Sequence, residues 1–202
     1  MPWIETIAYA DSGGRLRRLY DRIKGPGDAV DDIMLAHSLR PHSMEGHMGL
    51  YKAVLHHGAN RVPKWFLETL GVWVSGLNRC DYCVAHHSAG LERLLGDAAR
   101  FAGIRDALAS GEIETGPFTA REKLALRYAE ALTRDPASPS EAMVQGLREA
   151  GYDDGEILEI NQVTAYFAYA NRTVLGLGCS TEGEVLGLSP GNAEDPEDWS
   201  HN

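Results

Sequence analysis

The chain has 202 residues, and 19 Lys and Arg against 29 Asp and Glu give a formal net charge of −10. Its hydrophobic share of 44% is ordinary for a globular protein of one domain, or of two halves that share one core. The acidic balance, without a basic stripe, excludes the usual nucleic-acid-binding surface and disfavours an anionic membrane as a partner.

The first residues show neither the charged leader nor the long apolar run of a targeting or membrane-spanning segment. We therefore expect a cytoplasmic protein, in a compartment where thiols are kept reduced. The chain has three cysteines. A close pair of cysteines in that compartment is more often catalytic or metal-binding than structural.

Apolar residues recur at helical spacing along most of the chain, which predicts an all-α fold. In chain order, helices are expected over residues 14–23, 29–39, 48–58, 62–77, 80–95, 119–134, 138–151 and 152–172. Thr119 and Glu122 have the spacing of a capping box. Asp153 and Glu156 repeat this spacing, and Ser138 is expected to cap the helix before them. Because residues 163–170 are β-rich in composition, a hairpin there is the alternative.

A helix–glycine–turn–helix pattern occurs twice along the chain. Gly58 is followed twenty residues later by Asn78, and Gly151 is followed by Asn171 at the same distance. Apolar positions between each glycine and its asparagine also correspond. The pattern indicates an internal helix–turn–helix repeat. The alternative is that two core helices end alike by coincidence.

These patterns suggest the domain organisation. Residues 1–188 are expected to form a single all-helical domain, with halves at 15–110 and 117–180 if the repeat is real. Residues 189–202 are rich in acids and lack Lys and Arg, so we expect an acidic tail. Trp199 could anchor that tail.

The stretch CDYCVAHH, residues 80–87, carries the chemistry. In a helix, Cys80, Cys83 and His87 lie on one face. Asn78 would cap this helix and place Cys80 in the first turn, where unpaired N–H groups and the helix dipole lower a thiol pKa. This argument favours Cys80 as the more acidic thiol, whereas His87 lies one turn beyond Cys83 and could take its proton.

Two thiols at this spacing can act as a dithiol peroxidase. A thiolate attacks a peroxide, becomes a sulfenic acid and condenses with its neighbour to a disulfide, which an external dithiol reduces. The leaving oxygen needs a proton donor, and Glu68 is the candidate. It lies among apolar residues, where burial raises a carboxyl pKa and suits a proton shuttle. The alternative is a Glu68 on the exposed side of an amphipathic helix.

Glu68, Cys80, Cys83 and His87 reproduce the pattern E-x11-C-x2-C-x3-H. With it, the chain resembles the alkylhydroperoxidase D family of the carboxymuconolactone decarboxylase-like superfamily, and more closely the peroxidase-related branch. The stretches FTAREKLALRYAEALTRDPASPSEA, GYDDGEILEINQVTAYFAYANR and CDYCVAHHSAGL carry the same resemblance, which spans residues 15–180.

The resemblance implies an all-α, alkylhydroperoxidase D-like fold, assembled as a homotrimer or homohexamer. It implies Cys83 as the nucleophile, Cys80 as its resolving partner, His87 as the activating base and Glu68 as the proton relay. We follow this order of the cysteines over the dipole argument, because Cys80 is expected nearer the surface, where a reductant reaches it. The founding enzyme has a catalytic histidine where Tyr82 stands here. Tyr82 either supplies a hydrogen bond instead or changes the activity or substrate.

The partners implied are a peroxide substrate and an external dithiol, and no cofactor or metal is expected. Other functions remain open. A zinc site could use Cys80, Cys83 and His87, with Glu68, His56 or His57 as the fourth ligand. A decarboxylase or isomerase of the same superfamily is a second alternative, although those relatives lack the cysteine pair. A redox sensor without enzymatic activity is the third.

Two further residues have structural interpretations. His86 points about 100° away from His87 around the helix, so it is expected to pack in the core or at a subunit interface. Cys179 lies in a loop-like stretch far from the cysteine pair along the chain. It is expected to be a free, buried thiol.

Overall fold

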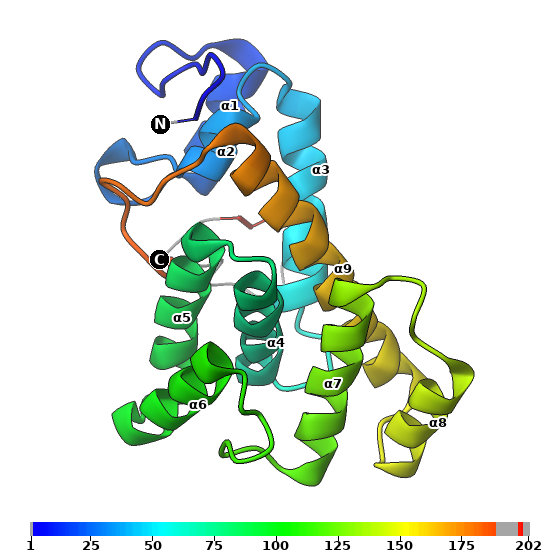
Figure 1. Ribbon diagram of the computed structural model, residues 1–202. Coiled ribbons are helices and arrows are strands. Elements are labelled where there is room, and N and C mark those ends of the chain that lie inside the picture. The colour runs from blue at the N-terminus through cyan, green and yellow to red at the C-terminus, as the bar shows by residue number, and fades with distance from the viewer. Residues whose placement is uncertain (1, 189–197, 200–202) are drawn as a thin grey trace.

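The computed structural model describes residues 2–188 and 198–199 (Figure 1). Among these residues every regular element is a helix, which confirms the all-α prediction. The elements are α1 (Gly14–Ile23), the 3-10 turn η1 (Pro26–Asp28), α2 (Asp32–Ala36), α3 (Pro41–Tyr51), the π-helical η2 (Lys52–His56), α4 (Lys64–Leu77), α5 (Asp81–Leu95), α6 (Ala98–Ser110), α7 (Ala120–Arg134), α8 (Glu141–Glu149) and α9 (Asp154–Leu177). None of the described helices is both long and apolar enough to span a bilayer.

Local capping chemistry sets several helix boundaries. The Thr119 box at the start of α7 and the Asp153 box at the start of α9 are both present, as predicted. The predicted cap at Ser138 is wrong, because Ser140 accepts the Met143 N–H and begins α8 two residues later. Residues 163–170 are helical within α9, so the hairpin alternative is excluded.

Helices α3 and α6 differ most from the sequence prediction. Helix α3 begins at Pro41 rather than at residue 48, because its buried stripe includes His47 between apolar residues and so escapes an apolar pattern. Helix α6 was not predicted. Asp97 caps it by accepting the N–H groups of Ala99 and Arg100, and Phe101 begins its buried face.

Helix α4 is the centre of the fold. It packs against α5, α6, α7 and α9, which surround it in Figure 1. Residues 66–75 are all buried, so the helix has no solvent-facing side over that stretch. Such a helix is expected to be apolar all round. Glu68, in the second turn, departs from that rule and therefore needs buried polar partners.

A glycine allows α4 and α9 to approach closely. A Cβ placed on Gly71 would lie 2.3 Å from the ring of Phe167. The same ring packs edge-on against His87 of α5, with the ring centroids 4.6 Å apart. Gly71 therefore sets the position of Phe167, and through it the position of one side of His87.

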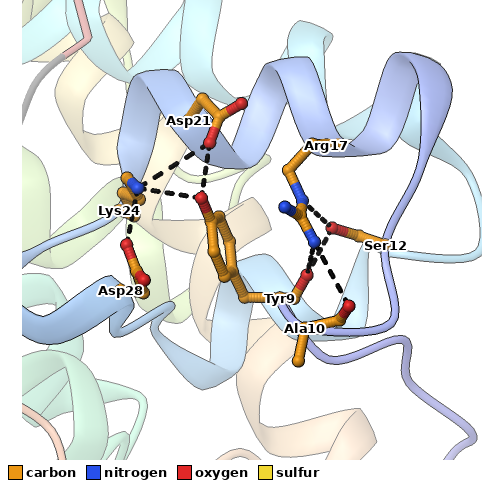
Figure 2. Close-up of polar contacts among 7 residues, drawn as sticks. All are labelled: Tyr9, Ala10, Ser12, Arg17, Asp21, Lys24 and Asp28. Atoms are coloured by element: carbon orange, nitrogen blue, oxygen red, sulfur yellow. Dashed lines mark hydrogen bonds and ion pairs between the residues drawn. The ribbon is translucent and has the colours of Figure 1, made fainter.

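The segment before α1 is held to that helix by polar contacts, which Figure 2 shows. The Tyr9 hydroxyl donates to Asp21 at 2.7 Å and accepts from Lys24 at 2.8 Å. Arg17 donates to the Tyr9 carbonyl and, at 2.7 Å, to the Ser12 hydroxyl. These contacts stabilise the N-terminal part of the domain.

The predicted acidic tail falls mostly on residues 189–197 and 200–202, which lie outside the described residues. Trp199 is described, and its ring packs under the Arg22 guanidinium at 3.7 Å. The two predicted halves of the domain stay a prediction. The asparagines of the two repeat units are hydrogen-bonded to each other, since Asn78 Nδ2 donates to Asn171 Oδ1 at 3.0 Å.

The close approach at Gly71 leads to a stability prediction. Gly71→Ala is expected to lower the free energy of unfolding by about 1–3 kcal/mol, because its methyl group overlaps the Phe167 ring. Gly76→Ala is the matched control in the same helix, because its Cβ would meet nothing within 4 Å. That change should be neutral or should stabilise by about 0.4–1 kcal/mol. Urea unfolding of both variants measures the difference, and equal midpoints would contradict the packing argument.

Candidate functional site

A strained turn places the cysteine pair. Helix α4 ends at Leu77, and Asn78 is its C-terminal cap rather than the predicted N-terminal cap of α5. Arg79 follows in the left-handed region at φ 57°, which is uncommon for a residue other than glycine. Cys80 then occupies the N-cap position of α5, and its N–H donates to the Ser75 carbonyl at 2.9 Å. Such strain persists where surrounding structure enforces it, often at functional sites.

Both cysteines of the pair are buried and free. Cys80 has no exposed surface and Cys83 is 3% exposed. The expected exposure of Cys80 to an outside reductant is therefore not observed in this structure. Cys179 is free, as predicted, but half-buried rather than buried, and it packs against the cluster that contains the pair.

The two thiols interact with each other. The hydrogen bond from the Cys83 side chain lowers the pKa of Cys80 below its ordinary value. The same hydrogen bond, together with burial, raises the pKa of Cys83 well above its ordinary value. A negative charge on the pair therefore rests at Cys80, with Cys83 donating to it. This order agrees with the dipole argument from the sequence.

Asn171 of α9 is a site residue that sequence reasoning did not assign to the pair. It is fully buried, donates to the Ser75 hydroxyl at 3.0 Å and accepts from Asn78. Its side chain also hydrogen-bonds both thiols and lowers the pKa of each. The signal available in the sequence was the repeat, which relates Asn78 to Asn171 and makes a contact between them plausible.

The predicted carboxyl group and imidazole meet. His87 Nδ1 lies 2.7 Å from Glu68 Oε2, and His56 Nε2 lies 3.9 Å from Glu68 Oε1. Glu68 is only 2% exposed, which excludes the alternative of an exposed glutamate. His56 is buried as well, so it faces this carboxylate from η2. The pair from α4 and α5 thus forms a buried acid–base unit with a second imidazole beside it.

One cavity connects these groups. Glu68, Cys83 and His87 all line it, whereas Cys80 does not. Aromatic side chains and the chain after α9 complete its wall, among them Tyr51, Tyr166 and Leu188. The cavity has a volume of about 70 Å³. A molecule in this space can contact Cys83 and the imidazole of His87, whereas it does not contact Cys80.

Tyr82 and His86 also form part of the wall of the cavity. The Tyr82 hydroxyl donates to Glu184 Oε1 at 3.3 Å, so its hydrogen bond goes to a carboxylate and not to the thiols. His86 lines the cavity, and its Nε2 lies 2.5 Å from Glu184 Oε2. Asp31 lines the same wall, and burial and the Glu184 charge raise its pKa to about 6.

The zinc site that the sequence left as an alternative is not formed in the structure. Across residues 2–188 and 198–199, the group of His, Cys, Asp and Glu side chains close enough to share an ion is Asp31, His86 and Glu184. Cys80, Cys83 and His87 do not form such a group: Cys80 does not line the cavity, and His87 Nδ1 is bound to Glu68. The site that contains the pair is therefore suited to thiol and proton chemistry.

A buried histidine with an orphaned ring nitrogen lies in the same wall. His47 is 3% exposed, and its Nδ1 has no hydrogen-bond partner among the described residues. Its Nε2 faces the Tyr166 hydroxyl at 3.4 Å, and the His37 and Tyr169 rings lie nearby. Burial, and then the neighbouring His37, lower the pKa of His47 to about 3. The imidazole is therefore held neutral in the folded protein.

Comparison with known proteins identifies the fold. An alkylhydroperoxidase AhpD core protein from Ralstonia eutropha JMP134, named peroxidase-related, is 21% identical with a TM-score of 0.76, covering 89% of this chain and 91% of its own. A peroxidase-related protein from Silicibacter sp. TM1040 is 26% identical with a TM-score of 0.66, covering 73% and 74%. The debrominase Bmp8, solved with 2,3,4-tribromopyrrole, is 19% identical with a TM-score of 0.65, covering 84% of each chain.

No family model matches the sequence, and no curated protein does so significantly. The solved neighbours show that the chain has the helical fold of an AhpD core protein, and the neighbour at 26% identity is named peroxidase-related. The predicted fold is thereby confirmed.

The neutral His47 predicts how acid destabilises the protein. The folded pKa lies below the unfolded value of about 6.5, so the unfolded chain binds an additional proton between about pH 6.5 and 3. This contribution to stability is complete above about pH 6.5 and falls by up to about 1.4 kcal/mol per pH unit below it. His47→Gln should flatten that part of the profile, measured by urea unfolding. The exposed His42→Gln is the control, and a His47→Gln profile as steep as that of wild type would contradict the assignment.

Proposed function

We propose that this AhpD-like chain is a thiol-dependent peroxidase that reduces hydrogen peroxide or a small organic hydroperoxide through Cys80 and Cys83. The observation that carries the proposal is the shared cavity. Its wall presents one sulfur of a buried thiol pair together with an imidazole bonded to a buried carboxyl group. A nucleophile and a proton donor that face one small space are the parts this reaction needs.

The proposed reaction has three steps. The Cys83 thiolate attacks one peroxide oxygen, the O–O bond breaks, and the departing RO⁻ takes a proton to leave as ROH while Cys83 becomes a sulfenic acid. The Cys80 sulfur then attacks the Cys83 sulfur, expels hydroxide that leaves as water, and forms the disulfide. An external dithiol reduces this disulfide by exchange and is itself oxidised to a disulfide.

Access decides which cysteine attacks first. Cys80 is the more acidic thiol, but it lies behind Cys83 and does not reach the cavity. Cys83 faces the cavity and donates its proton to Cys80. Transfer of that proton along the existing hydrogen bond converts Cys83 into the thiolate and Cys80 into the thiol. Cys80 thus serves as the immediate base of Cys83, and the assigned order of nucleophile and resolving partner is kept.

The Glu68–His87 pair supplies the proton for the leaving oxygen. With Nδ1 bonded to the carboxylate, His87 keeps Nε2 for a second partner, and its side chain lines the cavity beside Cys83. Proton transfer from a positioned imidazole contributes about 10²–10⁴-fold to such steps. Glu68 holds the ring orientation and stabilises its protonated form, and His56 lies close enough to share the charge.

The size and lining of the cavity indicate which substrates fit. The confined, partly aromatic cavity favours a small hydroperoxide over one with a bulky chain. A debrominase with the same fold shows that the fold accommodates another substrate class, so a brominated pyrrole is a useful second electrophile. A cytoplasmic homotrimer or homohexamer served by an external dithiol is part of the proposal.

Stopped-flow oxidation of single cysteine variants tests the proposal. Sulfenic acid formation with hydrogen peroxide should be lost in Cys83→Ser, because the sulfur that faces the cavity is gone. In Cys80→Ser a sulfenic acid should form and persist, since no neighbour condenses with it. Cys179→Ser is the control and should react as wild type does. Sulfenic acid that forms in Cys83→Ser but not in Cys80→Ser would reverse the order, and unreactive wild-type thiols would refute the proposed function.

Glu68→Gln tests the proton relay. The amide keeps the size of the side chain but cannot stabilise a protonated His87, so the peroxidase rate should fall by about 10²-fold or more. The slope of the rate against pH should change as well, which a purely structural defect would not produce. Glu159→Gln is the control, because that carboxylate caps the chain at Arg61 and Val62, away from the thiols. A Glu68→Gln enzyme with the wild-type rate and pH profile would remove Glu68 from the mechanism.

A further inference from the structure

A second cluster of chemically active side chains lies at the same cavity as the Glu68–His87 pair. Asp31, His86 and Glu184 each offer one ligand atom, and these atoms lie within 4.8 Å of one another. They come from three separate parts of the chain: the residue before α2, the second turn of α5 and the segment after α9. From this convergence we propose that Asp31, His86 and Glu184 bind one divalent first-row metal ion, a site independent of the thiol chemistry.

Glu184 is already oriented as a metal ligand. Its Oε1 accepts the Asp32 N–H at 2.5 Å and the Tyr82 hydroxyl at 3.3 Å. Its Oε2 is turned to His86 Nε2, at 2.5 Å. Hydrogen bonds of this kind fix a ligating carboxylate and are a regular feature of metal sites. Tyr82 therefore has a role on this side of the cavity, where it positions Glu184.

Asp31 is directed into the cluster rather than used for capping. It occupies the N-cap position of α2, where an aspartate usually accepts a backbone N–H, yet its side chain makes no such bond. Glu184 accepts the Asp32 N–H instead. Among the described residues, no Lys or Arg forms an ion pair with Asp31 or Glu184. Two half-buried carboxylates this close repel each other, and a bound cation offsets that repulsion.

The ligand set indicates the class of ion. Imidazole with two carboxylates suits Mn²⁺, Fe²⁺ or Zn²⁺ and lacks the thiolates that select softer ions. Ligand atoms at about 2.1 Å from a metal lie roughly 3–3.6 Å from one another. Atoms within 4.8 Å of one another therefore need only small movements to share an ion, and the 2.5 Å contact of His86 with Glu184 would open slightly. Three protein ligands leave a coordination position open, and Asp31 and His86 line the cavity into which it would face.

Binding would also tie down the wall of the cavity. Glu184 belongs to the segment after α9, and Gly187 and Leu188 of that segment line the cavity. A metal that joins Glu184 to Asp31 and His86 would therefore hold this segment against α2 and α5. Because metal ligands bind in their deprotonated forms, the affinity should rise with pH.

Titration of the metal-free full-length protein with Mn²⁺ tests the site. Mn²⁺ is the probe because thiolates do not select it. Calorimetry and the loss of the free Mn²⁺ paramagnetic resonance signal should show one ion per chain. His86→Gln, Glu184→Gln and Asp31→Asn should each weaken binding by about 10-fold or more, and Tyr82→Phe should weaken it less. Glu182→Gln is the control, an exposed carboxylate of the same segment that should bind as wild type does.

Two further measurements distinguish metal binding at this cluster from metal binding at the thiols. Saturating Mn²⁺ should raise the thermal midpoint of wild type and of Cys83→Ser, but not that of Glu184→Gln. Glu184→Gln keeps an oxygen for the Asp32 N–H, so it is expected to fold. Wild type that does not bind Mn²⁺, ligand variants that bind as wild type does, or binding lost in Cys83→Ser would each overturn the proposal. None of these results depends on peroxidase activity.

Discussion

The structure depends on a carboxylate at the centre of its most buried helix. Removing a charged carboxylate from water costs several kcal/mol, and Glu68 lies in a stretch of α4 with no solvent-facing side. That cost is tolerated only where a hydrogen-bonded partner is held in place. His87 provides the partner from α5, and His56 adds a second imidazole from η2. Helix α5 must therefore lie against α4 in one register, and the turn between them must be short.

The short turn also creates the thiol pair. Three residues separate the last residue of α4 from the first of α5, and Arg79 among them adopts the left-handed conformation. This backbone places Cys80 at the N-cap and Cys83 one turn into α5, on the face that also carries His87. The geometry that partners Glu68 is thus the geometry that brings a sulfur to the same cavity. The turn that brings a partner to the buried Glu68 is therefore the same turn that places the thiols for their chemistry.

Much of this arrangement could be predicted from the sequence because its causes are local. The capping boxes at Thr119 and Asp153 depend on residues three apart, and the spacing of Cys80 and Cys83 fixes their separation in any helix. The meeting of Glu68 and His87 was predictable for a related reason, since two helices joined by a tight turn must pack side by side. The helical register then limits which side chains face each other.

What could not be predicted depends on long-range contacts. Nothing near Cys80 in the sequence indicates the turn that precedes it, because Arg79 reveals its conformation only in the folded structure. Asn171 lies 93 residues from Asn78, and its hydrogen bonds to the thiols follow from the packing of α9 on α4. The contact of His86 with Glu184 spans 98 residues and depends on a segment without regular structure. Sequence periodicity carries no information on such pairs.

The wall of the cavity carries two clusters of different chemical character. One joins a single buried carboxylate to imidazoles and lies beside a thiol pair that shares a proton. The other places two carboxylates around one imidazole. Burial, and then the charges of Glu184 and Asp31, raise the pKa of Tyr82, whereas the hydrogen bond with Cys80, together with burial, raises the pKa of Cys83. Ionisation within the thiol pair is therefore controlled by the two cysteines themselves, and the two clusters can carry out separate chemistry in one cavity.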